Sequence, residues 1–349
     1  MECEKGTSVE YPPEGASYNH RVQPEQASFV IVGAGAVGTV LAGCLARAAH
    51  RVTLITRPSY VAQMNDGLLR VFGISDFEVR VQVAGELHEG SPDYLILAVK
   101  TPDTEGALAA VQGLAPKTVL SLQNGLAKDQ ILSKVFGREK VLGATSIIGA
   151  SMVQPGVAEH TFNGATLLGE LEGAPSERAM RLADILSWAG LRAEVTDNIG
   201  AAEWSKLCQY APAALVSVLS RLPYYQICLS EPLAEVFVQL TRECAAVATA
   251  CGSEVGDYPG FNIKSLVEVS ESEAVRSIVE RGEDMERRGM TGMRISMLQD
   301  VERGHPTELE ETIGDVVRRG AEANVPVPWM RLGYLVVRGI EANWRRPTR

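Results

Sequence analysis

The chain has 349 residues, 46% of them hydrophobic, which predicts two domains and a sizeable buried core. Its formal net charge of −10 and its lack of a basic cluster argue against nucleic acid or anionic membranes as partners. No apolar run reaches the roughly 18 residues of a membrane span, so we expect no membrane insertion. Residues 1–27 carry acids, prolines and polar residues without an apolar signal segment, and they predict a flexible N-terminal arm.

The cysteines and histidines indicate neither disulfides nor a metal site. None of the six cysteines forms a C-x-x-C pair, and most lie in helical apolar patterns. This usage is typical of reduced, buried thiols in a cytoplasmic protein. The five histidines are scattered without metal-ligand spacing, so no metal site is predicted.

The most informative stretch is FVIVGAGAVG, in which a buried strand over Phe29–Val32 runs into glycines spaced G-x-G-x-x-G. A helical pattern over Val37–Ala49 and a second strand over Arg51–Arg57 follow. This context is what the dinucleotide-binding fingerprint requires, and the alternative is a glycine-rich turn in another α/β fold. The cofactor-binding residues expected here are Gly33, Gly35, Ala36, Val37 and Gly38.

Each glycine of this turn has its own expected task. Gly33 allows the tight turn, Gly35 lets the backbone approach a pyrophosphate, and Gly38 lets the helix pack near the strand. The N-terminus of the helix then offers free N–H groups and the positive end of its dipole to the phosphates.

The end of the second strand favours NADPH over NADH. NAD-binding folds usually place an acid there for the ribose 2′-hydroxyl, whereas this strand ends in Thr56 and Arg57. A guanidinium suits a 2′-phosphate through bidentate, charge-assisted hydrogen bonds. The alternative is a solvated surface arginine at the end of a strand.

Further strands follow in the first half of the chain. Buried strands are predicted over Tyr94–Val99, Thr118–Leu122 and Val141–Ser146. The stretch Gly156–Glu170, with its small polar and β-branched residues, predicts antiparallel hairpin strands.

The second half is predicted to be helical. After an amphipathic helix over Ser176–Ala189 and a short strand over Leu191–Val195, patterns with a period of 3.6 dominate from about Gly200. The expected helices span Ala201–Leu222, Leu233–Cys251, Ile263–Val269, Ser272–Glu286, Glu308–Ala323 and Met330–Asn343.

This change of pattern near Asn198 predicts a Rossmann-type α/β N-terminal domain followed by an all-helical C-terminal domain. After the arm, we expect an NADP-binding domain over 28–198 and a helical substrate and catalytic domain over 199–349. Ligands of open α/β sheets bind beyond the carboxyl ends of the strands. We therefore expect the active cleft between that sheet edge and the helical domain.

Two polar residues directly follow predicted strands at this edge. Lys100 follows YLILAV and is either a cation for the cofactor phosphates or a solvated lysine. Asn124, in SLQNGL, either orients the nicotinamide, its ribose or the substrate, or belongs to an ordinary Asn-Gly turn.

The helical half contributes three further candidates. Lys206 lies on a mostly apolar helix, where a lysine is either functional or extends its charged end to solvent. Ser296 lies in ISMLQD. Glu308, directly after Pro306 and Thr307, is also a candidate first-turn acid that a helix dipole would stabilise.

The segments VIVGAGAVG, LILAVK, SLQNGL, NIGAAEWSKL and SMLQDVERGHPTELEETIG resemble, in this order, the ketopantoate reductases (2-dehydropantoate 2-reductases) of pantothenate biosynthesis. The resemblance covers the chain from about Phe29 to Ile340. It implies NADPH between the two domains, with Lys206 as the general acid and Glu308 positioning it. It also implies that Ser296 contacts the substrate carboxylate and that Asn124 bridges cofactor and substrate.

One departure from the family concerns the substrate. The family usually has asparagines one and two turns after the lysine, where this chain has Tyr210 and Ala214. Tyr210 can supply a hydroxyl to the substrate, but Ala214 offers no side-chain hydrogen bond. The alternatives to a ketopantoate reductase are a reductase of another ketone, 2-oxo acid or imine, and a non-catalytic NADP(H)-binding sensor. We expect a small carbonyl substrate, and a homodimer is left open.

Overall fold

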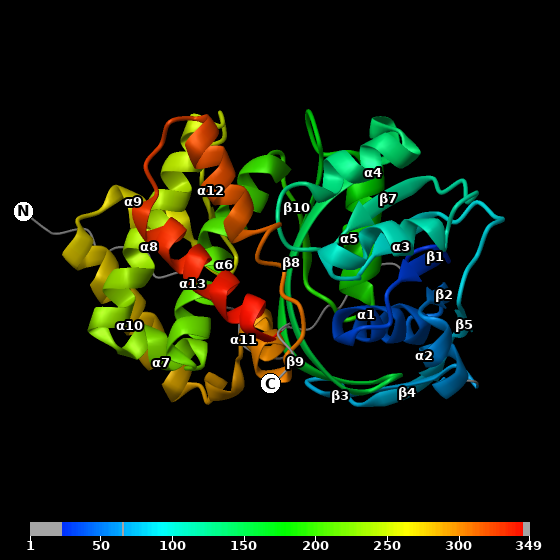
Figure 1. Ribbon diagram of the computed structural model, residues 1–349. Coiled ribbons are helices and arrows are strands. Elements are labelled where there is room, and N and C mark those ends of the chain that lie inside the picture. Colours follow the sequence, from blue (N-terminus) through cyan, green and yellow to red (C-terminus); the bar gives the residue numbers. More distant parts are fainter. Residues whose placement is uncertain (1–22, 65, 345–349) are drawn as a thin grey trace, which may run out of the picture.

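The computed structural model describes residues 23–64 and 66–344, which form an α/β half and a helical half side by side (Figure 1). Of the arm expected over residues 1–27, residues 1–22 lie outside the described residues.

A parallel sheet organises the α/β half. Its strands are β1 (Ser28–Val32), β2 (Arg51–Ile55), β5 (Gln82–Ala84), β6 (Tyr94–Leu97) and β7 (Thr118–Ser121). They lie in the order β5-β2-β1-β6-β7, and all neighbours run parallel. The Rossmann-type prediction is therefore confirmed. The order reverses between β1 and β6, the place where such sheets bind ligands.

A second, mixed sheet was only partly predicted. It consists of β3 (Leu68–Gly73), β4 (Phe77–Arg80), β8 (Leu142–Gln154), β9 (Val157–Glu170) and β10 (Ala193–Val195). The antiparallel hairpin pairing predicted for Gly156–Glu170 is confirmed, but the stretch forms one long strand and its partner, β8, precedes it. The turn lies earlier, at Pro155-Gly156, and Gly156 has the left-handed φ of +79° that favours glycine.

Helix α1 (Ala36–Arg47) packs between the two sheets. Its apolar side chains share one core with Phe29 and Ile31 of β1 and with Leu69 and Val71 of β3. Helix α5 (Glu177–Trp188) joins this core, whereas α3 (Thr104–Ala109) and α4 (Lys128–Phe136) cover the opposite face of the parallel sheet. A short helix, α2 (Pro58–Gln63), follows β2.

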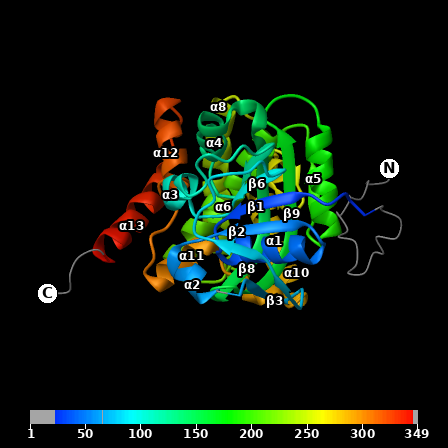
Figure 2. The ribbon, with the colours of Figure 1, turned by 90° about the vertical axis from the view of Figure 1, so that its right-hand side faces the viewer.

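The helical half is built around α6. Its helices are α6 (Ile199–Ser220), α7 (Tyr224–Leu229), α8 (Glu231–Ala250), α9 (Ile263–Glu268), α10 (Glu271–Arg287), α11 (Ser296–Arg303), α12 (Ile313–Glu322) and α13 (Pro328–Trp344). Two short strands, β11 (Asp257–Tyr258) and β12 (Phe261–Asn262), pair with each other. Seen from the α/β side, β1, β2 and α1 lie in front of this bundle (Figure 2). No helix in the described part of the chain is long and apolar enough to cross a membrane.

The segment between α11 and α12 differs from its prediction. The helix expected over Glu308–Ala323 begins only at Ile313, so Glu308 is not in a first helical turn. Two tertiary hydrogen bonds and one within the segment hold the preceding residues in an irregular conformation. The Thr307 N–H and hydroxyl donate to Glu341 of α13 at 3.0 and 2.6 Å, and the Thr312 hydroxyl donates to the Glu308 carbonyl at 2.6 Å.

The buried His160 of β9 should make folding stability sensitive to acid. Burial lowers the pKa of His160 below its ordinary 6.5, so the unfolded chain takes up the proton more readily. The free energy of unfolding should therefore fall as pH drops below 6.5. Urea denaturation at pH 7 and pH 5 should show a smaller loss of unfolding free energy for His160→Leu than for the parent. An equal loss in both proteins would contradict this assignment.

Candidate active site

The glycine turn after β1 has the geometry that a dinucleotide needs. Gly33 has a φ of +117°, and a Cβ on Gly38 would lie 1.9 Å from the Gly33 carbonyl oxygen, so the fold itself requires both glycines. Gly35 is different, because a Cβ there would meet no atom of the chain nearer than 4.0 Å. Its missing Cβ leaves space next to the N-terminus of α1, where a phosphate can approach.

The next two residues, Ala36 and Val37, form the first turn of α1. The N-cap residue, Gly35, supplies no side-chain hydrogen bond to this turn. The first N–H groups of a helix have no partner within the helix, and those of α1 follow directly after Gly35. The turn therefore fits the pyrophosphate of a nicotinamide dinucleotide.

Arg57 lies just beyond the carboxyl end of β2, at the same edge. It is exposed, and its guanidinium lies 4.9 Å from the ring centroid of Tyr60. Within the described residues it has no carboxylate partner, so its charge is available to an anionic ligand. The structure brings it to the sheet edge that also carries the glycine turn.

Glu308 joins the two halves across the cleft. One carboxylate oxygen, Oε1, accepts hydrogen bonds from the N–H and the hydroxyl of Thr101, at 3.1 and 2.9 Å. The other, Oε2, accepts one from the Asn124 side-chain amide at 3.0 Å. Both donors follow strands of the parallel sheet, whereas Glu308 is 6% exposed and precedes α12. These bonds, rather than a helix dipole, hold the carboxylate.

Lys100 makes a second link of the same kind. Its ammonium pairs with the carboxylate of Asp300, a buried residue of α11. Lys100 and Asn124, both expected near the cofactor, thus face the helical half in this structure.

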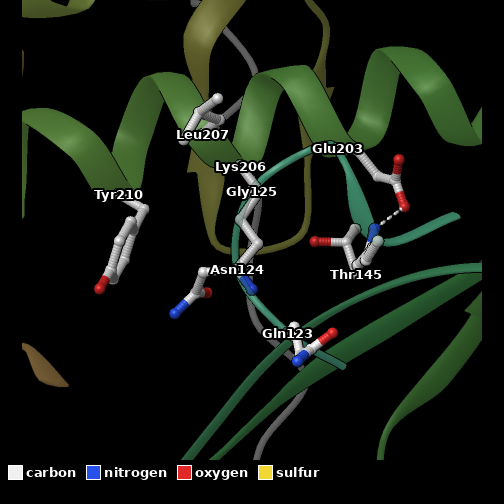
Figure 3. Close-up of a pocket in the computed structure, with 9 residues that line it drawn as sticks. Gln123, Asn124, Gly125, Thr145, Glu203, Lys206, Leu207 and Tyr210 are labelled. Atoms are coloured by element: carbon white, nitrogen blue, oxygen red, sulfur yellow. Dashed lines mark hydrogen bonds and ion pairs between the residues drawn. The ribbon is translucent and has the colours of Figure 1, made fainter. Parts of the chain in front are cut away.

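A small pocket lies between α6 and the turn after β7 (Figure 3). Lys206 extends from α6 past Gly125, and Tyr210 lies one turn further along on the same side of the helix. The residues that line this pocket are Gln123, Asn124, Gly125, Lys128, Thr145, Glu203, Lys206, Leu207 and Tyr210.

The surroundings of Lys206 weaken its hold on a proton. Burial lowers the pKa of Lys206 to about 8, and the nearby Lys128 cation acts in the same direction. The carboxylates of Glu308 and Glu203 oppose this shift. Lys206 can therefore release a proton near neutral pH, as a general acid must.

Ser296 and Tyr210 meet at one end of the site. Their hydroxyl oxygens lie 3.1 Å apart, and burial raises the pKa of Tyr210, which keeps its hydroxyl protonated. Ala214 is fully buried and contributes no surface to the pocket. Of the two positions that differ from the family's usual asparagines, Tyr210 is therefore the one that lines the pocket.

Sequence analysis missed the partners of the site residues. Thr101 donates to Glu308, and Asp300 pairs with Lys100. Lys128 pairs with Glu203. The position of Thr101 directly after Lys100 was a usable signal, since both follow one strand. Nothing in the pattern pointed to Lys128, which lies on a different half of the molecule from Glu203.

Comparisons with known proteins match both halves. The family model "Ketopantoate reductase PanE/ApbA" matches residues 29–173, and its C-terminal counterpart matches residues 198–341. The chain belongs to the ketopantoate reductase family. A 2-dehydropantoate 2-reductase of Pyrococcus abyssi is 27% identical over 315 residues, which cover 89% of this chain and 97% of the relative. One from Archaeoglobus fulgidus is 28% identical, over 90% and 97%.

Solved structures share this fold. A PanE/ApbA family ketopantoate reductase from Ralstonia eutropha is 30% identical, with a TM-score of 0.74 over 91% of this chain and 100% of that chain. A D-mandelate dehydrogenase solved with NADH and anilino(oxo)acetate is 21% identical, with a TM-score of 0.79 over 91% and 100%. Proteins with this fold thus act on more than one substrate.

Proposed function

We propose that this chain is an NADPH-dependent reductase of a 2-oxo acid, with ketopantoate, which it would reduce to pantoate, as the default substrate. The observation that carries the proposal is Lys206, an amine with a pKa of about 8 in a pocket next to Glu308 and Asn124. The names of the curated relatives support the substrate class.

The residues divide the chemistry between them. The cofactor would be held by Gly33, Gly35, Ala36, Val37, Gly38 and Arg57, with Lys100 near its phosphates and Asn124 at its nicotinamide side. When bound, the nicotinamide supplies a hydride to the substrate carbonyl carbon. Negative charge then develops on the carbonyl oxygen, and the Lys206 ammonium stabilises it and donates the proton.

The remaining residues orient lysine and substrate. The Glu308 carboxylate favours the charged form of Lys206, against the effect of burial. Its hydrogen bonds to Thr101 and Asn124 fix its position across the cleft. The hydroxyls of Ser296 and Tyr210 offer two adjacent donors to the substrate carboxylate.

A second candidate is a reductase of a different 2-oxo acid, ketone or imine. The observation that favours it is Tyr210, which fills space at the substrate end where the family usually has an asparagine. A site that loses a polar partner for one substrate loses discrimination for it. A non-catalytic NADP(H) sensor explains Lys206 and Glu308 less well.

The deciding experiment follows NADPH oxidation with ketopantoate and with a panel of larger, more apolar 2-oxo acids. We expect turnover of ketopantoate. Turnover of another carbonyl without turnover of ketopantoate would establish the second candidate. Tight NADPH binding with no turnover of any compound would instead support a non-catalytic NADP(H)-binding sensor.

A further inference from the structure

A buried ion pair lines the pocket and joins the two halves of the molecule. Lys128, the first residue of α4, is 3% exposed, and Glu203 of α6 is 9% exposed. Their side chains form a hydrogen-bonded ion pair, and Asp129 contributes a second carboxylate oxygen 3.7 Å from the Lys128 ammonium. Burial alone would lower the pKa of Lys128, but these two carboxylates raise it, so the lysine stays charged. Burial also raises the pKa of Glu203, to about 8, and the Lys128 ammonium opposes that rise by favouring the carboxylate form.

Such a pair is a poor device for stability. The free-energy cost of removing two charges from water often equals or exceeds their mutual attraction. Apolar residues of similar volume in their place often leave the folded state equally stable. We therefore look for a neighbouring group in the pocket on which the two charges act.

That neighbour is Lys206. Glu203 lies three residues before it on α6, a spacing that places two side chains on one face of a helix. Lys128, Glu203 and Lys206 line the same pocket, and Figure 3 shows Glu203 and Lys206 reaching from the same helix. The pair thus sets a cation and a carboxylate beside the amine.

The groups that act on Lys206 come from three elements. Lys128 of α4 disfavours its charged form, whereas Glu203 of α6 and Glu308 before α12 favour it. The other titratable groups of this neighbourhood are Asp129, beside Lys128, and Tyr210, one turn along α6. Asn124 and Thr145 complete the polar lining without charge.

We propose that Lys128 and Glu203 are positioning residues for Lys206, whose opposed charges fix its ammonium in the pocket and set how readily it gives up its proton. The proposal rests on the proposed function, in which Lys206 is the proton donor. Glu308, held by Thr101 and Asn124, acts on the same amine from a different element.

The two single substitutions must act in opposite directions. Lys128→Gln removes a cation, so Lys206 should keep its proton to a pH about one unit higher. Glu203→Gln removes a carboxylate and leaves Lys128 with Asp129 as its remaining partner, so Lys206 should lose its proton about one unit lower. A glutamine at either position still reaches its partner with a hydrogen bond. If the ion pair had a purely structural role, both variants would be less stable but the titration midpoint of Lys206 would not shift in opposite directions.

The titration can be read without turnover. Acetic anhydride reacts with the neutral amine, so labelling across a pH series, with mass spectrometry of the Lys206 peptide, gives the midpoint. The alkaline limb of kcat with NADPH and a 2-oxo acid provides the second readout. Lys117→Gln is the matched control, because Lys117 pairs with Asp93 at the opposite edge of the sheet, and the midpoint should not move.

Opposite shifts in the two variants support the proposal, and shifts of the same sign, or none, overturn it. Should one single variant fail to fold, the direction of the shift in the other decides. A midpoint equal to that of the parent overturns the proposal. Failure of the proposed function would appear separately, as a parent protein that turns over no substrate while its Lys206 still titrates.

Discussion

Replacing Lys206 with alanine should lower turnover by a factor on the order of 10² to 10⁴ and leave the affinity for NADPH nearly unchanged. The substitution removes the proton donor and the charge that faces the developing alkoxide. The cofactor is expected at the glycine turn and Arg57, which lie on the other half of the molecule. Steady-state kinetics with a 2-oxo acid and fluorescence titration with NADPH measure the two effects separately.

The same assignment fixes the pH dependence of the parent. Only the charged amine can donate a proton, so the rate of reduction should fall as the pH rises through about 8, the pKa of Lys206. Lys117→Ala serves as the control, since that lysine is exposed and distant from the pocket. Unchanged turnover in Lys206→Ala would remove this residue from the mechanism. Loss of NADPH binding in step with turnover would instead make it a binding residue.

Local patterns of the sequence were sufficient to predict the parallel sheet and its glycine turn. The fingerprint of Gly33, Gly35 and Gly38 depends on residues next to one another in the chain, and the structure shows why two of them are required. Four of the five parallel strands, β1, β2, β6 and β7, are short apolar runs with clear ends, so they too were predicted within about two residues. The short edge strand β5 was not predicted.

The parts that were missed depend on contacts between distant segments. Glu308 is held by donors about two hundred residues earlier, and Thr307 binds Glu341 of the last helix. No local pattern encodes such bonds, which is why a helix was expected where an irregular segment is found. Lys128 and Glu203 become neighbours only when the two halves meet. The positioning role that we propose for this pair could therefore not be predicted from the sequence.

Replacing Arg57 with alanine should weaken NADPH binding by about 10- to 100-fold and change NADH binding little. The guanidinium lies just beyond β2, where the ribose of a dinucleotide is expected, and no carboxylate in the described part of the chain neutralises it. Hydrogen bonds to a charged phosphate are worth more than neutral ones, and NADH has no phosphate at this position. Isothermal titration calorimetry with both cofactors measures the ratio.

The control for this experiment lies on the same strand. Arg51 is also exposed but begins β2, at the edge of the sheet opposite the glycine turn, so Arg51→Ala should bind both cofactors as the parent does. Raising the ionic strength should reduce the NADPH preference of the parent, because exposed charges are screened, and should have little effect on Arg57→Ala. Equal weakening of NADPH and NADH in Arg57→Ala would show that the arginine contacts a part common to both cofactors. In that case the preference for NADPH would need another residue at this edge, since Thr56 beside it is largely buried and carries no charge.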